Sequence, residues 1–225
     1  MRKLCFVTGT DTEVGKTAAS CALLIAAREA GLSTAAIKPV AAGCDENGHN
    51  EDALALMECM TSNLSYEQVN PVALPEAIAP HLAAEHAGRR LRTGQLAGLC
   101  RGVMASGADF VLIEGAGGWR VPIGPRDTLA DLARELQAPV VLVVGMRLGC
   151  INHALLTAEA VLRDGLELAG WVANQPGEAM NCHGENLDTL QRLLPAPLLG
   201  EIPHLTPWSA QQASQHVDIH RLKPK

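Results

Sequence analysis

Gly15, Lys16 and Thr17 stand between a short apolar run and a segment rich in alanine and leucine. A Gly-Lys-Thr triplet in this setting is typical of a loop that binds nucleotide phosphates, because the N–H groups and the dipole at a helix start favour negative charge. Lys16 would add a cation for the β- and γ-phosphates, and the Thr17 hydroxyl would be a ligand of Mg²⁺. We therefore predict a phosphate-binding loop that includes Glu13 and Val14.

The spacing of this loop departs from the usual motif. Five residues separate Gly9 from Gly15, where the usual form has four, and Thr10 stands where the first glycine is expected. A polar helix start with a surface lysine is the alternative interpretation. The apolar run at residues 4–7 before the loop and the apolar helix predicted at 17–30 after it favour the phosphate-binding interpretation.

Lys38 and Glu114 each come at the end of a predicted strand. Residues 33–40 form an apolar run whose regular structure must end at Lys38-Pro39, and residues 110–113 lead into Glu114 and a glycine-rich turn that includes Gly115 and Gly117. In open α/β sheets, ligands bind beyond the carboxyl ends of the strands. The alternatives are a solvated lysine at a loop edge and a chance acid in a tight turn.

Asp52 lies in the first turn of a helix predicted at 51–60, with Asn50 as its N-cap. The helix dipole stabilises a negative side chain at this position, so an ordinary first-turn acid is the simplest interpretation. The same position would let its carboxylate reach a metal ion at the sheet edge. Because Gly-Lys-Thr is present, we expect Glu114 to hold Mg²⁺ together with Thr17.

The remaining apolar runs complete an alternation of strands and helices. Further strands are predicted at 139–145, 168–174 and 197–202, and further helices at 81–88, 93–106, 128–137, 150–164 and 185–194. Residues 70–80 carry three prolines and are predicted to be irregular, and no structure is assigned beyond residue 206. This order predicts a single α/β domain over residues 1–225, a P-loop NTPase fold with a mostly parallel sheet and helices on both faces.

Composition narrows the class of protein. The formal charge is −6, and Arg89, Arg90 and Arg92 form only a local cluster, interpreted as a solvated helix end, so nucleic acid is not expected as a partner. The seven cysteines include no Cys-x-x-Cys pair, which favours reduced thiols in a cytoplasmic protein. No signal peptide is visible and no apolar run approaches the ~20 residues that cross a bilayer, so no membrane association is expected.

Several separated strings together resemble one family, the dethiobiotin synthetases of biotin biosynthesis. They follow the family's order from residue 7 to residue 203: VTGTDTEVGKT at 7–17, IKPVAAG at 37–43, EDALAL at 51–56, VLIEGAGGW at 111–119, LGCINHALLTA at 148–158, GWVAN at 170–174 and APLLGEIP at 196–203. The longer phosphate loop resembles that family's own version.

The resemblance implies ring closure of 7,8-diaminononanoate with CO₂, supplied as bicarbonate, at the expense of ATP and with Mg²⁺. The product is dethiobiotin, formed through a carbamate and a carbamic-phosphoric anhydride. Lys16 and Lys38 are then the expected catalytic residues, and Thr17, Asp52 and Glu114 would complete the Mg²⁺ site. Nucleotide would meet residues 13–17 and 114–117, Asp52, Asn174 and residues 202–204; these sets include Ala116, Ile202, Pro203 and His204.

The resemblance also assigns the substrate contacts. The diamine would be faced by Thr12, Glu13, Lys38 and position 42. The substrate carboxylate would bind at the helix start with Gly149, Cys150 and Asn152, which a second subunit contributes. This arrangement implies a homodimer with shared sites. One departure is Ala42, where the family commonly has a serine that hydrogen-bonds the substrate. Losing that bond would cost about 0.5–1.5 kcal/mol.

Two rival functions remain open at this point. One is another ATP-dependent amide-forming enzyme, such as a cobyrinate amidation enzyme, but those usually carry a glutamine-hydrolysing portion for which no room remains. The other is a partner-gated ATPase of the chromosome-partitioning type. Such proteins typically have an additional lysine early in the loop, where this chain has Thr10, Asp11 and Thr12.

Overall fold

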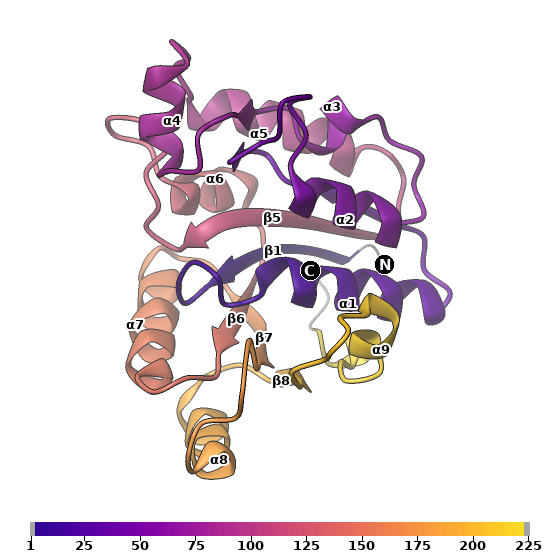
Figure 1. Cartoon of the computed structure of the whole chain (residues 1–225), viewed down its shortest axis with the longest axis vertical. Helices are drawn as coiled ribbons and strands as arrows, with labels where there is room; N and C mark the ends of the chain where they lie inside the picture. The colour runs from indigo at the N-terminus through magenta and orange to yellow at the C-terminus, as the bar shows by residue number, and fades with distance from the viewer. Residues whose placement is uncertain (1–2, 223–225) are drawn as a thin grey trace.

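The computed structural model describes residues 3–222, and its main sheet has the strand order β2-β5-β1-β6-β7-β8 (Figure 1). Every neighbouring pair in this sheet is parallel. The strands are β1 (Lys3–Gly9), β2 (Thr34–Ile37), β5 (Phe110–Gly118), β6 (Val140–Gly145), β7 (Leu168–Asn174) and β8 (Leu198–Ile202). All six predicted strands are present, which confirms the predicted α/β class with a parallel sheet.

Helices connect these strands, as parallel pairing requires. They are α1 (Lys16–Glu29), α2 (Glu51–Cys59), α3 (Tyr66–Val69), α4 (Pro80–His86), α5 (Thr93–Met104), α6 (Leu129–Leu136), α7 (Cys150–Arg163), α8 (His183–Leu193) and α9 (Ala210–Ser214), followed by a 3₁₀ turn at Ile219–Arg221. None of the helices between residues 3 and 222 combines the length and the apolarity needed to span a membrane.

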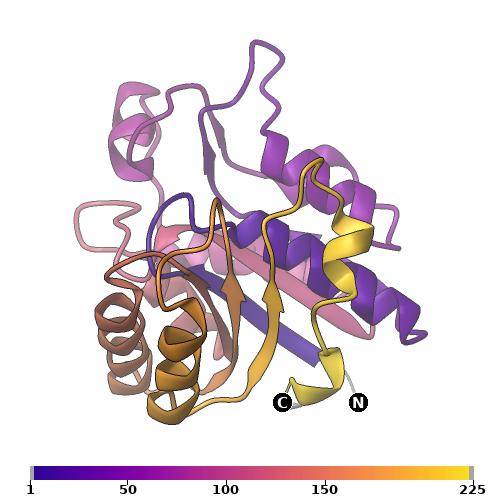
Figure 2. The ribbon, with the colours of Figure 1, turned by 60° about the horizontal axis from the view of Figure 1, so that its bottom comes forward.

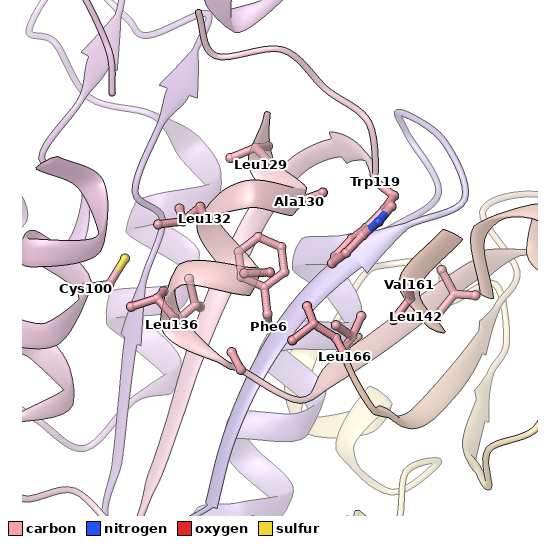
Figure 3. Close-up of a cluster of buried hydrophobic side chains, with 14 of the residues drawn as sticks. Phe6, Cys100, Trp119, Leu129, Ala130, Leu132, Leu136, Leu142, Val161 and Leu166 are labelled. Carbon is pink, nitrogen blue, oxygen red and sulfur yellow. The ribbon is translucent and has the colours of Figure 1, made fainter. Parts of the chain in front are cut away.

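The two faces of the sheet carry separate hydrophobic cores. Along β1, Leu4 and Phe6 belong to one core, whereas Cys5 and Val7 belong to the other, because successive side chains of a strand point to opposite faces. Helices α4 to α8 contribute buried side chains to the first core, and α1, α2 and α9 contribute to the second. Figure 3 shows part of the first core, where the rings of Phe6 and Trp119 meet edge to face with centroids 6.2 Å apart.

Single residues mark the start of α2 and the turn after α1, the two helices that carry Asp52 and Thr17. Asn50 caps α2 with its side chain, which accepts a hydrogen bond from the Ala53 N–H, as predicted. After α1 the chain turns at Gly31, whose φ of 82° is the left-handed conformation that glycine adopts without strain, and Leu32 N–H donates to the Ala27 carbonyl.

One predicted turn is wrong. Glu114 was expected at the end of its strand with a glycine-rich turn after it, but β5 continues to Gly118 and Glu114 pairs with Val7 inside the strand. The register of β1 and β5 shifts between Val7 and Gly9, and Gly9 then pairs with Gly118. The glycines therefore extend the strand, and β5 has two more residues than β1 between these two pairs, an irregularity of the bulge type that lies on β5.

Several short elements carried no recognisable signal. The proline-bearing stretch contains β4 (Ala73–Leu74), which pairs in parallel with β3 (Ala41–Ala42) to form a second sheet. The tail beyond residue 206 contains α9, which lies beside α1 in Figure 2. The Gln211 side chain of α9 donates a hydrogen bond to the Glu29 carboxylate at the end of α1. Residues 1–2 and 223–225, the ends of the predicted domain, lie outside the described residues.

Candidate active site

The loop between β1 and α1 is closed by two glycines that tolerate no side chain. A Cβ at Gly9 would lie 2.7 Å from a methyl group of Val14 and 2.8 Å from the Asp11 carbonyl oxygen. Gly15 has a φ of 83°, and a Cβ there would overlap the Asn174 amide. The first essential glycine of this loop is thus Gly9, and the extra residue in the spacing is absorbed within the loop.

Lys16 points back over this loop. Its ammonium group donates a hydrogen bond to the Asp11 carbonyl oxygen at 3.1 Å, and its side chain is only 8% exposed. Burial lowers the pKa of Lys16, because removing an ammonium from water disfavours its charged form. Glu13 in the same loop has a φ of 58°, a conformation that costs about 1–3 kcal/mol in a non-glycine residue and is concentrated at ligand-binding loops.

Four of the predicted site residues meet in one cluster. The Lys38 ammonium lies 2.6 Å from Asp52 Oδ2 and 2.7 Å from Glu114 Oε1, and Thr17 Oγ1 donates to the same Glu114 oxygen at 2.9 Å. Lys38 is 4% exposed, Glu114 is fully buried and Asp52 is 36% exposed. The end of β2, the middle of β5 and the first turns of α1 and α2 therefore converge on a single buried charge cluster.

The charges of this cluster support one another. Burial disfavours the charged form of Lys38, but Glu114 and Asp52 more than offset it, so the pKa of Lys38 is raised above its ordinary value. Burial likewise works against the Asp52 carboxylate, but Lys38 holds the pKa of Asp52 below its usual range. Lys38 and Asp52 thus each favour the charged form of the other.

A hydrogen-bond network without any recognisable sequence signal holds Lys38 and α2 in place. The Asn70 amide donates to the Lys38 carbonyl oxygen at 2.7 Å, and Tyr66 donates its hydroxyl hydrogen to the Asn70 side chain at 3.0 Å. The same Tyr66 oxygen accepts from the backbone N–H of Asn50, the N-cap of α2. Tyr66 and Asn70 belong to a segment without a recognisable motif, so only the three-dimensional structure reveals their positioning role.

Asn174 and Ile202 lie side by side at the ends of β7 and β8. They are register partners, and the Asn174 amide donates to the Val14 carbonyl oxygen at 3.0 Å, which brings this sheet edge to the phosphate loop. The next residues, Pro203 and His204, follow directly in the loop after β8, and the His204 ring lies 3.1 Å from the Thr206 hydroxyl. Of the residues predicted for the adenine, Asn174 thus contacts the phosphate loop and Ile202 lies beside Asn174 in the sheet.

The glycines after Glu114 serve close packing. A Cβ at Gly115 would lie 3.2 Å from both the Phe6 ring and the Val7 carbonyl oxygen. At Gly117 a Cβ would lie 2.9 Å from Val121 and 3.4 Å from the Thr12 hydroxyl. Thr12 therefore stands over the end of β5, next to the partly buried Ala116 and Gly117.

The predicted carboxylate-binding turn is tied to the phosphate loop by an ion pair. Gly149 adopts a φ of 95° and begins α7, where Cys150 is buried and Asn152 is exposed. Arg147, two residues earlier, donates to Asp11 Oδ2 at 2.6 Å. Neither Arg147 nor Asp11 was a predicted site residue, because a single surface charge pair across 136 positions leaves no pattern in one sequence.

Ala42 lies on β3 opposite Leu74 of β4, half-buried, with no polar side chain of its own. Within residues 3–222, no three side chains among the histidines, cysteines, aspartates and glutamates lie close enough together to hold a metal ion. The two carboxylates and the hydroxyl near Lys38 are therefore a partial ligand set, to which phosphate and water oxygens would have to be added.

Comparison with known proteins agrees with this geometry. A family model described as an AAA domain matches residues 3–212. The ATP-dependent dethiobiotin synthetase BioD of Pseudomonas paraeruginosa is 57% identical over 220 residues, which is 96% of each chain. The protein of the same name from Cellvibrio japonicus is 56% identical over 98% of each chain.

Solved structures give the fold. The septum site-determining protein MinD of Pyrococcus horikoshii, solved with Mg-ADP, has a TM-score of 0.55 at 16% identity, covering 95% of this chain and 93% of its own. A ParA family ATPase of Chlorobium tepidum has a TM-score of 0.55 at 12% identity over 95% and 90% of the two chains. At such identities the likeness establishes the P-loop NTPase fold alone, whereas the sequence identity above 50% and the shared length show that this chain belongs to the family of ATP-dependent dethiobiotin synthetases.

Proposed function

We propose that the chain closes the ureido ring of dethiobiotin from 7,8-diaminononanoate, CO₂ and ATP, at the site around Lys38. The observation that carries this proposal is the buried ammonium of Lys38 between two carboxylates, within one hydrogen-bonded cluster with Thr17 of the phosphate loop. A loop that only binds and releases nucleotide has no need for a second buried lysine. A reaction that phosphorylates an anionic carbamate does need one, because charge accumulates on both reactants.

The reaction divides into three balanced steps. One amine of the substrate attacks CO₂, forming a C–N bond and releasing a proton. A carbamate oxygen then attacks the γ-phosphorus of ATP, ADP leaves, and a mixed anhydride forms. The second amine attacks the carbonyl carbon, phosphate leaves, and the ring is closed with loss of a second proton. Phosphoryl transfer itself is mainly positioning and stabilisation of charge.

The two lysines have separate roles in this proposal. Lys16, anchored on the Asp11 carbonyl, would turn to the β- and γ-phosphates when nucleotide fills the loop. Lys38 would hold the carbamate and the transferring phosphoryl group. Thr12 and Glu13, in the same loop, would face the two amines, where a carboxylate suits an ammonium group. Catalysis thus depends on cations that are already held in place before the substrates bind.

The residues present fit Mg²⁺. Thr17, Asp52 and Glu114 offer hard oxygen atoms, and Glu114 Oε2 is buried without a hydrogen-bond partner among the described residues. A buried carboxylate oxygen left unpaired is costly unless a cation or a water reaches it. When bound, Mg²⁺ would neutralise charge on the phosphate oxygens. The chain's own contribution is the orientation of Glu114 by Thr17 and Lys38.

The remaining contacts in this proposal are those to the adenine, the phosphates, the diamine and the substrate carboxylate. Asn174 and residues 202–204 would receive the adenine, and residues 114–117 would border the phosphates and Thr12. Ala42 offers a methyl group where the family commonly has a hydroxyl, so this enzyme would bind the diamine with one hydrogen bond fewer. The helix start with Gly149, Cys150 and Asn152 would meet the substrate carboxylate. The Cys150 N–H already donates to the Arg147 carbonyl oxygen, so the N–H groups that follow it would bind the carboxylate.

We propose further that the enzyme is a homodimer in the cytoplasm. Apolar side chains lie exposed on α7 and the turn before it: Leu148 is 93% exposed, Leu156 57% and Leu162 47%. A surface of this kind favours association, and it adjoins the turn that would serve a neighbouring subunit. All seven cysteines are free, which suits a reducing compartment. Light scattering after size-exclusion chromatography, with Leu156→Asp as the variant, tests the dimer.

The test of the function follows ADP release with Mg-ATP and bicarbonate, with and without 7,8-diaminononanoate, and identifies the product by mass. We expect ADP release that depends on the diamine and is matched by dethiobiotin. Slow ADP release indifferent to the diamine would refute the proposed reaction and favour a partner-gated ATPase. Nothing in the geometry favours that rival, since the likeness to ParA and MinD proteins extends only to the fold.

A further inference from the structure

A hollow of about 1070 Å³ lies apart from the nucleotide loop, between α4, the turn that follows it and the loop after β5. Its lining includes four arginines, at positions 89, 90, 92 and 126, together with Leu91 and His81. We call it the arginine hollow. Three of its arginines were predicted to be a solvated helix end, and they are exposed. The structure adds the exposed Arg126, from 34 positions later in the chain, to the same lining.

The frame of the arginine hollow is fixed by backbone and core contacts. Leu91 and Ile123, which line the hollow, are 5% and 1% exposed and belong to the first hydrophobic core. The Arg89 N–H donates to the Ala84 carbonyl at 2.8 Å, and the Ile123 N–H donates to the Asp127 carbonyl at 2.9 Å. The backbone around the hollow is therefore held by hydrogen bonds and by the core, and the arginines are attached to this backbone.

The charges of the arginine hollow are not neutralised by ion pairs. Elsewhere in residues 3–222, arginines pair with carboxylates, as Arg101, Arg120, Arg134, Arg147 and Arg221 do. The four arginines of the hollow form no ion pair within the described residues, although Glu85 and Asp127 also line it. Four guanidinium groups facing two carboxylates leave an excess of positive charge on a chain whose overall charge is −6.

His81 also lines the arginine hollow, with a ring that is partly exposed. Its Nδ1 is buried without a hydrogen-bond partner in the described structure, so this atom is shielded from the hollow as well as from solvent. The hollow thus combines four arginines without ion pairs and the accessible part of one imidazole ring.

We propose that the arginine hollow binds a small organic anion carrying two or more carboxylate or phosphate groups. Guanidinium groups bind both of these groups through paired hydrogen bonds, and the volume is that of a small-molecule site. This site is distinct from the catalytic cluster, since none of its lining residues belongs to that cluster.

Titration calorimetry on the full chain, saturated with Mg-ADP so that the phosphate loop is filled, tests this proposal. The probes are pyrophosphate and tricarballylate at constant free Mg²⁺ and about 0.15 M salt, conditions under which loose surface attraction is screened. We expect at least one probe to bind once per chain with a Kd below about 1 mM. Binding of pyrophosphate alone would identify phosphate as the recognised group, and binding of tricarballylate alone would identify carboxylate.

The matched variants are Arg90→Ala/Arg126→Ala in the hollow and Arg101→Ala/Arg221→Ala outside it. The first should weaken binding at least about tenfold, as loss of two charge-assisted contacts requires, and the second should leave it unchanged. Diamine-dependent ADP release should persist in both, which shows that both fold and separates this test from that of the proposed reaction. Absence of binding by both probes, or equal weakening by the two double variants, would overturn the proposal.

Discussion

Replacing Lys38 with methionine isolates the charge on which the proposed site depends. Met keeps most of the length of the lysine side chain and removes only its ammonium group. In the wild-type chain that ammonium contacts Glu114, which is fully buried, and Asp52, which is 36% exposed. Without it, Glu114 keeps only the Thr17 hydrogen bond on one oxygen, and its other oxygen already has no partner among the described residues.

The expected loss in the free energy of unfolding depends on which carboxylate stays buried without its partner. Removing one partner of a buried ion pair costs about 3–5 kcal/mol, because the other charge stays buried without compensation. Asp52 can regain water, so we expect the low end, a fall of about 3 kcal/mol in the free energy of unfolding. Lys38→Met/Glu114→Gln removes the stranded charge as well and should recover most of this loss, since the two changes act on one contact.

Urea denaturation of the nucleotide-free protein measures these free energies. Arg101→Met is the control, because it breaks an exposed pair with Glu135, and it should cost at most about 1 kcal/mol. A loss for Lys38→Met no larger than that of the control would refute the burial argument. So would a double variant as unstable as the single one. Lys38→Met should also lose ring closure while retaining ATP binding in calorimetry.

The pH dependence of the same variant follows from Asp52. Lys38 holds the pKa of Asp52 below its usual value, so Asp52 contributes stability above its unfolded pKa of about 3.9, and this contribution is lost as the pH falls through the folded value. Lys38→Met has no such contribution to lose. Its deficit relative to wild type should therefore shrink on acidification below about pH 4, and a deficit independent of pH would contradict the assignment.

Four further outcomes are expected. Lys16→Gln should lower ATP affinity and turnover together in calorimetry and ADP-release assays, and unchanged values would exclude its phosphate role. Because burial lowers the pKa of Lys16, ATP affinity in the wild type should fall as the pH rises toward the ordinary lysine value of about 10.4, whereas Lys16→Gln should lack this decline. Gly15→Ala should abolish nucleotide binding through overlap with the Asn174 amide; Gly31→Ala, with the same left-handed φ but open space around it, should lower stability only. Ala42→Ser should improve diamine affinity by about 0.5–1.5 kcal/mol, a lower KM with unchanged ATP affinity, and no change in KM would remove Ala42 from the substrate site.

The long elements could be predicted from the sequence because their signals are local. The run VVLVVG of β6 is apolar throughout, as a strand buried on both faces must be, and Asn50 marks the start of α2 by its own side chain. The glycines after Glu114 misled the prediction for a physical reason. Glycine suits turns, but it also suits a strand whose neighbour approaches closely, and only the Phe6 ring beside Gly115 distinguishes the two.

The site could be predicted only where a motif specifies residue types. Gly15, Lys16 and Thr17 are a contiguous pattern, whereas Tyr66 and Asn70 act through one hydroxyl and one amide on a backbone far away in the sequence. Arg126 lies in the same lining as Arg90 only through the tertiary fold, so the sequence predicts the exposed cluster but not the hollow that it borders. Contacts made by single polar atoms between distant segments have no period and no spacing, and the sequence of one chain does not reveal them.

The charge cluster also explains why a buried lysine is useful at a cost in stability. Buried ion pairs add little to stability when compared with apolar residues of similar size, so the arrangement of Lys38, Asp52 and Glu114 calls for a reason other than folding. Together with Lys16, these groups have two positive and two negative formal charges, which sum to zero before any ligand is present. A polyanionic nucleotide entering such a site is favoured only if further positive charge comes with it or if a carboxylate gives up its partner. The shared oxygen of Glu114, bonded to both Lys38 and Thr17, is where that exchange would act, because freeing it releases the Lys38 ammonium toward the reacting oxygens. A resting cluster of zero formal charge, in which one Glu114 oxygen has no partner among the described residues, thus keeps two carboxylates and a lysine ready for a substrate whose charge must be balanced at the moment of transfer.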